Sequence, residues 1–406
     1  MIRTWGWRST FGSLENRNFR WLWSGGLASS ATFQMSGVAQ GWLVYELTGS
    51  AFALGWVSAG WSISTLVLSL YGGVLCDRLD KRAILLWARF AMILNSLVLG
   101  MLISLGIIRV WHIAASSLIT GVLFAFLMPA QQSILVDLVD RDTLLNANSL
   151  NSVGMGLMGI FAASAAGWLI EELGVAAVYY STALLYAIAL LTLTKLPSVP
   201  GDSDGQRSVW RDLWEGVRYI RQNGAILSLL ILALSRVLLG MPYRNLMPKY
   251  AKDVMGLEAT GLGTLLAAPG LGSLIVAVLL ASLGNFRGKG RLYILAGTFM
   301  GLALAVFSQV RSLPVALLSL GIVGAASNAC MVVNQTLMQS YSDDGYRGRV
   351  MSVYMMMWGL TPLGTIPAGA VADRLGVSVV LMAQGVLLAA SFVLAWLLNK
   401  RVRAMH

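Results

Sequence analysis

Residues 72–86 read GGVLCDRLDKRAILL and form a short polar stretch between two long apolar runs. Gly73 allows two helices to approach closely. Asp77 can cap a helix N-terminus, where its negative charge meets the positive end of the helix dipole. The cations of the stretch are Arg78, Lys81 and Arg82. An ordinary cytoplasmic loop of a membrane protein needs only the cations, so the glycine and the aspartate indicate a more specific element.

The composition of the whole chain places this element in a membrane protein. Of 406 residues, 57% are apolar and 12% are charged, whereas soluble domains carry about 25% charged residues. These values exclude a soluble globular protein, a disordered chain and a secreted domain built on disulfides. The net charge of +11 sits in clusters between apolar runs, which favours a membrane surface over nucleic acid. With two cysteines and two histidines, we expect no metal and no cofactor.

Apolar runs long enough to cross a bilayer recur along the chain, since a spanning helix needs roughly 20 mostly apolar residues. The runs are 21–46, 51–76, 83–108, 110–136, 146–170, 174–194, 224–248, 258–283, 291–310, 314–340, 350–372 and 376–398. We therefore predict an all-α polytopic membrane protein with twelve transmembrane helices in two pseudo-symmetric six-helix bundles. The bundles are residues 1–194 and 224–406. Residues 195–223 form a cytoplasmic linker, in which Trp210, Trp214 and Val217 recur at the spacing of an amphipathic helix.

The positions of Lys and Arg predict the orientation. If the N-terminus is cytoplasmic, 21 of these residues lie in inner segments and six in outer ones. This excess follows the positive-inside rule and predicts that both termini are cytoplasmic.

A short pattern repeats at the end of four predicted helices, where a small residue is followed four positions later by a polar one. The pairs are Gly73 and Asp77, Gly167 and Glu171, Ala281 and Asn285, and Gly369 and Asp373. The second helix of each three-helix group carries one pair, which is what nested inverted repeats would leave behind.

The stretch after the second run resembles the G-x-x-x-D-R-x-G-R-R/K-x-x-L loop of the major facilitator superfamily. The matching residues are Gly73, Asp77, Arg78, Lys81, Arg82 and Leu85, and the departures are Asp80 in place of glycine and Lys81 in place of arginine. Three further stretches, within residues 18–57, 127–152 and 346–376, resemble the branch that contains enterobactin exporters and macrolide-efflux proteins.

This resemblance implies the major facilitator fold and export of amphiphilic small molecules, siderophore-like or drug-like, from a bacterial cytoplasm. It implies location in the bacterial cytoplasmic (inner) membrane, protons as the coupling ion and a monomer. By the same resemblance, Asp77 caps the eleventh helix and Lys81 pairs with Asp137, which holds an inner gate shut in the outward-facing state. The expected inner-gate residues are Gly73, Asp77, Arg78, Lys81, Arg82, Asp137, Arg347 and Arg349. The fifth helix lacks the Gly-Pro pair that many exporters carry, so an importer or a lysophospholipid-flipping carrier remains the alternative.

Polar residues inside the predicted helices indicate a substrate cavity. Arg236 lies about 18 Å into the seventh helix at 1.5 Å per residue, and every Asp and Glu falls at a helix end or in a loop. Arg236 therefore either meets an anionic substrate or is held by neighbouring amides and carbonyls. The resemblance implies that helices one, four, seven and ten line the cavity. The expected cavity residues are Arg236, Gln34, Gln131, Asn328, Asn334, Gln335 and Trp358.

Other classes of membrane protein lack support in this sequence. An embedded enzyme would need a nucleophile with a base, or a metal site, and no histidine pairs with a carboxylate or a cysteine at membrane depth. A receptor would need a signalling domain, and a primary pump would need a Gly-rich phosphate loop. We therefore predict a secondary transporter that works by alternating access and is not an enzyme. Because no buried carboxylate is visible, proton coupling rests on the resemblance alone.

Overall fold

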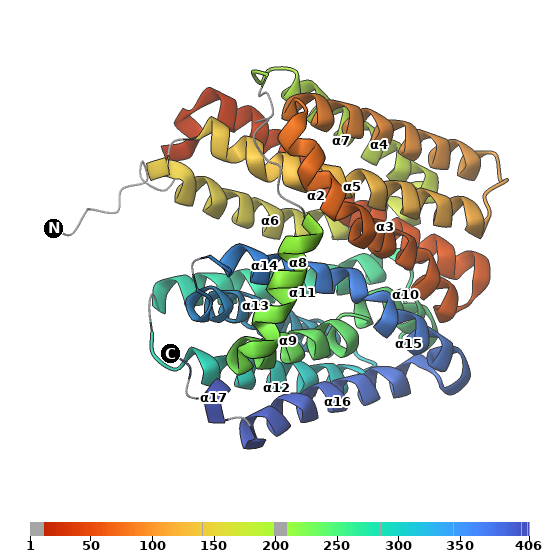
Figure 1. Cartoon of the computed structure of the whole chain (residues 1–406). Coiled ribbons are helices and arrows are strands. Elements are labelled where there is room, and N and C mark those ends of the chain that lie inside the picture. The colour runs from red at the N-terminus through yellow and green to blue at the C-terminus, as the bar shows by residue number, and fades with distance from the viewer. Residues whose placement is uncertain are drawn as a thin grey trace.

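The computed structural model describes residues 12–139, 141–198, 209–283, 286–343, 345–398, 400–403 and 405. Within these ranges, the side chains of residues 12, 69–70, 72–78, 136–137, 141–145, 209–213, 281, 283 and 400–401 lie outside the description. The described chain is helical almost throughout. The helices form two bundles that pack side by side (Figure 1).

The N-terminal bundle follows a short turn, η1 (Gly12–Glu15). Its helices are α2 (Arg17–Thr48), α3 (Ala51–Arg78), α4 (Lys81–Ser104), α5 (Val110–Leu138), α6 (Arg141–Leu173) and α7 (Val175–Leu193). The linker contains the helix α8 (Val209–Gln222). This helix begins near the junction of the bundles and runs over the C-terminal bundle (Figure 1).

The C-terminal bundle contains two interrupted helices. The first consists of α9 (Gly224–Ser235), the π-helical turn η2 (Arg236–Gly240), α10 (Tyr243–Lys249) and a second π-helical turn, η3 (Tyr250–Val254). The other consists of α14 (Arg347–Met356), η4 (Met357–Leu360) and α15 (Pro362–Leu375). The remaining helices are α11 (Ala259–Leu283), α12 (Lys289–Phe307), α13 (Leu313–Tyr341), α16 (Val377–Leu398) and α17 (Lys400–Arg403). Both breaks precede a proline, Pro242 or Pro362, whose ring cannot continue a regular helix from the preceding turn.

Within the described residues, ten segments are long and apolar enough to cross a membrane. Two of the twelve predicted runs are not among them, namely α2 and the segment from α14 to α15. The first carries polar residues such as Gln34 and Gln40, and the second is broken by η4. The predicted all-α polytopic membrane fold is confirmed. The division of the chain into bundles at residues 194 and 224 stays a prediction.

The two bundles meet along two helix crossings, α3 with α15 and α6 with α11. Small residues bring the backbones together at both. A Cβ atom placed on Gly369 would lie 2.4 Å from the carbonyl oxygen of Ala51, and one on Gly167 would lie 2.4 Å from that of Ala259. Real Cβ atoms do not approach this closely, so both positions require glycine for the helices to touch.

The two ends of the bundles are distinguished by the linker. We call the end where α8 lies against α14 the linker end, and the opposite end, where Ala51, Lys249 and Asp373 lie, the far end. The buried residues form two clusters, a large one that includes residues of both bundles, among them Tyr243 and Tyr250, and a smaller one within the N-terminal bundle around Phe19 and Leu85.

Candidate substrate cavity and the contacts that close it

A cavity of about 340 Å³ lies between the two bundles, within the size range of sites for drug-sized ligands. Most of its wall comes from the N-terminal bundle. The C-terminal bundle contributes Met241, the residues Arg244, Asn245 and Pro248 of α10, and Leu266, Trp358 and Thr361. Aromatic side chains form part of this wall, since Phe33 stacks on Phe124 with 5.6 Å between ring centroids and both rings contact Trp61.

The polar part of the wall is mostly neutral. Its amides and hydroxyls are Gln34, Ser36, Gln40, Ser58, Ser62, Asn95, Ser96, Ser116, Ser117, Thr120, Tyr179, Tyr186, Asn245 and Thr361. Some of them bond to one another, as Asn95 does when its amide donates to the Ser116 hydroxyl at 2.8 Å. Among the described lining residues, Arg244 alone is charged. A cavity of this kind suits a ligand with an apolar body and a few polar groups.

The predicted cavity residues fall into two groups. Gln34 and Trp358 line the cavity. Gln131 lines a small separate pocket beside Arg89. The amides of α13, which are Asn328, Asn334 and Gln335, lie outside the described lining of the main cavity. Helices one, four and seven thus contribute to the wall as expected, whereas no α13 residue appears among the described lining residues, and substrate contact by these amides stays a prediction.

Arg236 is buried rather than open to the cavity in this conformation. Its side chain is 2% exposed, and its guanidinium carbon lies 5.6 Å from the centroid of the Trp358 ring. Nη1 is 3.5 Å from the Ser327 hydroxyl, and Nη2 has no hydrogen-bond partner among the described groups. Trp358 also lines the cavity, whereas Arg236 is not among the described lining residues. A role of Arg236 in substrate contact stays a prediction.

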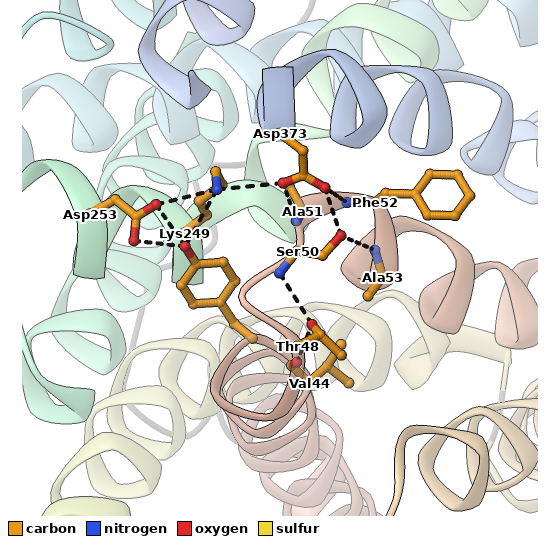
Figure 2. Close-up of polar contacts among 10 residues, drawn as sticks. Val44, Thr48, Ser50, Ala51, Phe52, Ala53, Lys249, Asp253 and Asp373 are labelled. Carbon is orange, nitrogen blue, oxygen red and sulfur yellow. Dashed lines mark hydrogen bonds and ion pairs between the residues drawn. The ribbon is translucent and has the colours of Figure 1, made fainter. Parts of the chain in front are cut away.

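The far end is closed by an ionic network directly beyond the cavity (Figure 2). Lys249 Nζ lies 3.4 Å from an oxygen of Asp373 and 3.3 Å from an oxygen of Asp253. The hydroxyl of Tyr45, on α2, donates to Asp253 at 2.6 Å. Val44 and Pro248 line the cavity, and the residues directly after them, Tyr45 and Lys249, belong to this network. The network therefore joins the two bundles at this end of the cavity.

Asp373 also caps a helix of the opposite bundle. Its carboxylate accepts hydrogen bonds from the backbone N–H groups of Ala51 at 2.7 Å and Phe52 at 3.0 Å, and from the Ser50 hydroxyl at 2.6 Å. Ala51 and Phe52 begin α3, so the carboxylate meets unpaired N–H groups and the positive end of the helix dipole. Asp373 lies just past the predicted span 350–372. Partial burial would raise its pKa, but these hydrogen bonds and Lys249 outweigh that effect and lower the pKa below its usual value.

A second cap forms at the other crossing of the bundles. The backbone N–H of Thr260, in the first turn of α11, donates to the carboxylate of Glu171 at 3.1 Å. Glu171 stands four residues after Gly167, as Asp373 stands four residues after Gly369. Two of the four small-residue and polar pairs of the sequence therefore act in the same way. In each, the glycine packs on the first carbonyl of the opposite helix and the acid caps that helix.

At the linker end, the structure describes part of the predicted inner-gate set. Gly73, Asp77, Arg78 and Asp137 fall on positions whose side chains lie outside the described residues. Lys81 is buried. Arg82 donates to the carbonyls of Leu193 and Thr194 at the C-terminus of α7, at 3.2 and 2.7 Å. Asp80, which departs from the superfamily pattern, caps α4 by accepting from the N–H groups of Arg82 and Ala83.

The remaining inner-gate residues lie on α14 and contact the linker helix or α13. Arg347 donates through Nε to the carbonyl of Gln339 at 2.9 Å. Arg349 pairs with Glu215 of α8 at 3.1 Å. One turn away, Tyr219 of α8 stacks on Tyr346 with 4.3 Å between centroids. The linker helix is thus fixed to the start of the eleventh helix of the chain.

The sequence pattern did not indicate several of these residues. It does not single out Tyr45, and it places Lys249 and Asp253 only at helix ends or in loops, although their spacing, four apart, is that of an ion pair on one helical face. Glu215 was not singled out, although it shares α8 with the predicted apolar positions. Arg244 was assigned to an outer segment, whereas the chain remains helical to Val254 and carries Arg244 inside the bundle.

Comparison with known proteins gives a consistent result. A family model described as transmembrane secretion effector matches residues 8–406. The chain is 27% identical to the multidrug efflux pump Tap of Mycolicibacterium fortuitum over 358 residues, which cover 85% of this chain and 87% of that protein. It is 25% identical to the enterobactin exporter EntS of Shigella boydii over 341 residues, covering 82% and 79% respectively.

Solved structures show the same fold. The nucleoside transporter NupG superposes with a TM-score of 0.76 at 13% identity, covering 94% of this chain and 99% of that one. At this identity the match shows the fold alone. The resemblance to major facilitator exporters seen in the sequence is confirmed.

Proposed function

This chain belongs to the transmembrane secretion effector family of the major facilitator superfamily, and from this premise we propose that it exports amphiphilic small molecules by alternating access. It is a multi-pass membrane transporter and not an enzyme. The observation that carries the proposal is the cavity of about 340 Å³ between the bundles, closed at the far end by the contacts of Tyr45 with Asp253 and of Asp373 with Ala51, which join them. Similarity to a multidrug efflux pump and to an enterobactin exporter supports export as the direction.

We assign the far end to the outside of a bacterial cytoplasmic membrane. The distribution of Lys and Arg supports this orientation, because their excess lies in segments at the linker end. Both termini are then cytoplasmic. The conformation described here, with the far end closed, is then the one that receives substrate from the cytoplasm.

In the proposed cycle, the two bundles rock about the cavity and exchange one set of helix caps for another. Opening the far end breaks the Asp373 cap on α3 and the Glu171 cap on α11. The pairs Gly73–Asp77 and Ala281–Asn285 stand at the opposite ends of α3 and α11. We propose that Asp77 then caps the start of α14, and that this cap holds the linker end shut while substrate leaves.

Protons remain the proposed coupling ion. The support is the family, since no carboxylate is found among the described residues that line the cavity. A proton that drives transport would therefore act away from the substrate. Asp77 and Asp137 at the linker end are the acids we propose for this role.

The test is transport by the purified protein in proteoliposomes, with a pH gradient imposed in either direction. The probes are fluorescent cationic, neutral and anionic amphiphiles that share one fluorophore. We expect accumulation of at least one class that follows the gradient in the direction of export, and none in liposomes without protein. Absence of protein-dependent movement for every probe would contradict the proposal, and accumulation in the opposite direction would favour import.

A further inference from the structure

Arg244 is the one charged residue among the described residues that line the cavity. Arg244 lines the cavity on α10, and its side chain is exposed there. No hydrogen bond or ion pair to a described residue satisfies its guanidinium, although five N–H donors are available on this group. Among the described lining residues there is no Asp or Glu that could neutralise it.

The backbone explains why Arg244 faces the cavity. The π-helical turn η2 and the break at Met241–Pro242 interrupt the seventh helix of the chain, and α10 restarts after them. On α10, Arg244, Asn245 and Pro248 stand at the spacing i, i+1 and i+4 of one helical side, and Met241 precedes them in the break. All four line the cavity. The interruption thus turns a cation and an amide toward the substrate space.

Arg236, eight positions earlier on the same interrupted helix, differs from Arg244 in the exposure of its side chain. Arg236 is 2% exposed and lies beside the Trp358 ring. Arg244 stands on the cavity side of the same interrupted helix. Of the two intramembrane arginines on this helix, only Arg244 can meet a ligand in the conformation described here.

We propose that the transporter selects amphiphiles that carry an anionic group, and that Arg244 is the residue that selects them. This inference rests on the proposed function, because it names the substrate class of the same cavity. The anion binds the guanidinium of Arg244 with the Asn245 amide beside it, and the apolar body lies against Phe33, Trp61 and Trp358. Charge-assisted hydrogen bonds to a guanidinium are stronger than neutral ones, and a cationic ligand in the same place would meet an unneutralised like charge.

The test is direct binding, independent of transport. The probes are dansylglycine, dansylamide and dansylcadaverine, which share one fluorophore and differ in charge from anionic through neutral to cationic. Binding is followed by energy transfer from tryptophan to the dansyl group, since Trp61 and Trp358 line the cavity. The protein is held in nanodiscs of phosphatidylcholine, so that no anionic lipid competes for the site.

Three variants separate the role of Arg244 from a general effect of charge. Arg244→Gln removes the cation, Arg244→Lys keeps it, and Arg311→Gln removes a cation from an exposed loop of the C-terminal bundle. We expect wild type to bind dansylglycine most tightly. Arg244→Gln weakens that binding about tenfold and leaves dansylamide nearly unchanged, whereas Arg244→Lys and Arg311→Gln keep the order of the three probes.

Two results would overturn the inference. One is a wild-type protein that binds dansylcadaverine as tightly as dansylglycine. The other is an Arg244→Gln variant whose preference for dansylglycine equals that of wild type. Failure of the proposed function gives a different result, namely the expected binding order without any protein-dependent transport of the anionic probe in proteoliposomes.

Discussion

The two crossings that close the far end use the same arrangement with unequal support. At the crossing of α3 with α15, Asp373 accepts from two backbone N–H groups and the Ser50 hydroxyl, and it also pairs with Lys249. At the crossing of α6 with α11, Glu171 is exposed and accepts one backbone hydrogen bond, from Thr260. The geometry of the glycine contact is the same at both, 2.4 Å to a carbonyl oxygen. Close packing is therefore shared, and the electrostatic part of the closure is concentrated on α3 and α15.

This difference suggests which crossing controls opening. Exposed single contacts contribute little, because water replaces them at small cost. Asp373 must lose its three hydrogen bonds to Ser50, Ala51 and Phe52 together when the bundles separate, whereas Lys249 lies in the same bundle as Asp373 and stays beside it. We therefore expect the α3–α15 crossing to contribute most of the stability of the closed far end, and the α6–α11 crossing to contribute less.

The largest effect is expected for Gly369→Ala. The added Cβ would meet the Ala51 carbonyl at 2.4 Å, and because that atom belongs to the backbone, α15 must move away from α3. The shift also withdraws Asp373, one turn later, from the helix it caps. Transport in proteoliposomes should fall by more than tenfold.

A matched control for this change is Gly321→Ala in α13, where the nearest atom to the added Cβ lies 3.9 Å away. Both changes replace glycine inside a helix and raise helix propensity by the same amount. Equal transport by the Gly369→Ala and Gly321→Ala variants would show that the close approach at Ala51 is not needed.

The next largest effect is expected for Asp373→Asn. The variant keeps the size of the side chain but removes the charge that meets Lys249 and the N-terminus of α3. Loss of an N-cap costs about 1 kcal/mol, and the charge of Asp373 meets two N–H groups and one hydroxyl of the opposite bundle. The ratio of closed to open far end should fall about tenfold, measured as labelling of a cysteine placed at Gln40 by a membrane-impermeant maleimide. Glu258→Gln removes another acid from the same end and should leave labelling as in wild type.

A smaller effect is expected for Glu171→Gln. Among the described residues, Thr260 is the one hydrogen-bond partner of this exposed carboxylate in the opposite bundle, through its backbone N–H and its hydroxyl. The same labelling assay should change less than about threefold. A change as large as that of Asp373→Asn would mean that the two crossings close the far end equally.

The smallest effect is expected for mild acid. The hydrogen bonds of the closed far end and Lys249 hold the pKa of Asp373 below its usual value of 3.8. A carboxylate with a lowered pKa stabilises the closed form at every pH above the usual value, and this stabilisation is lost only as the pH falls through the lowered pKa. Closure should therefore not change between about pH 5.5 and pH 7.5 on account of Asp373. A transition near pH 6 that disappears in Asp373→Asn would instead identify Asp373 as a proton carrier.

Much of the fold was predictable from the sequence, because apolar runs of the length of a bilayer are a local property. The helix of the linker and the pairs Gly167–Glu171 and Gly369–Asp373 were visible for the same reason. What the pairs touch was not visible, since Asp373 and Ala51 are 322 positions apart. Their partners became evident only when both bundles were in place.

The cavity was harder to predict than the fold. A polar residue inside an apolar run indicates a function, but the run does not say which way its side chain faces. Arg236 and Arg244 lie on one interrupted helix, and a π-helical turn followed by a break changes the register between them. The arginine nearer the middle of the run is therefore buried beside Trp358, while the one near its end reaches the cavity.

The central claim is that the α3–α15 crossing contributes more to the closed far end than the α6–α11 crossing does. The most direct test of this claim is to measure two distances between pairs of spin labels. One pair, at Ile107 and Leu375, spans the bundles at the far end, and the other, at Leu79 and Tyr341, spans them at the linker end; all four side chains are exposed. The labels are introduced after replacing Cys76 and Cys330. For Asp373→Asn we expect a longer far-end distance and a shorter linker-end distance than in wild type, with a smaller change for Glu171→Gln. Unchanged distances in Asp373→Asn, or equal shifts in the two variants, would contradict the account.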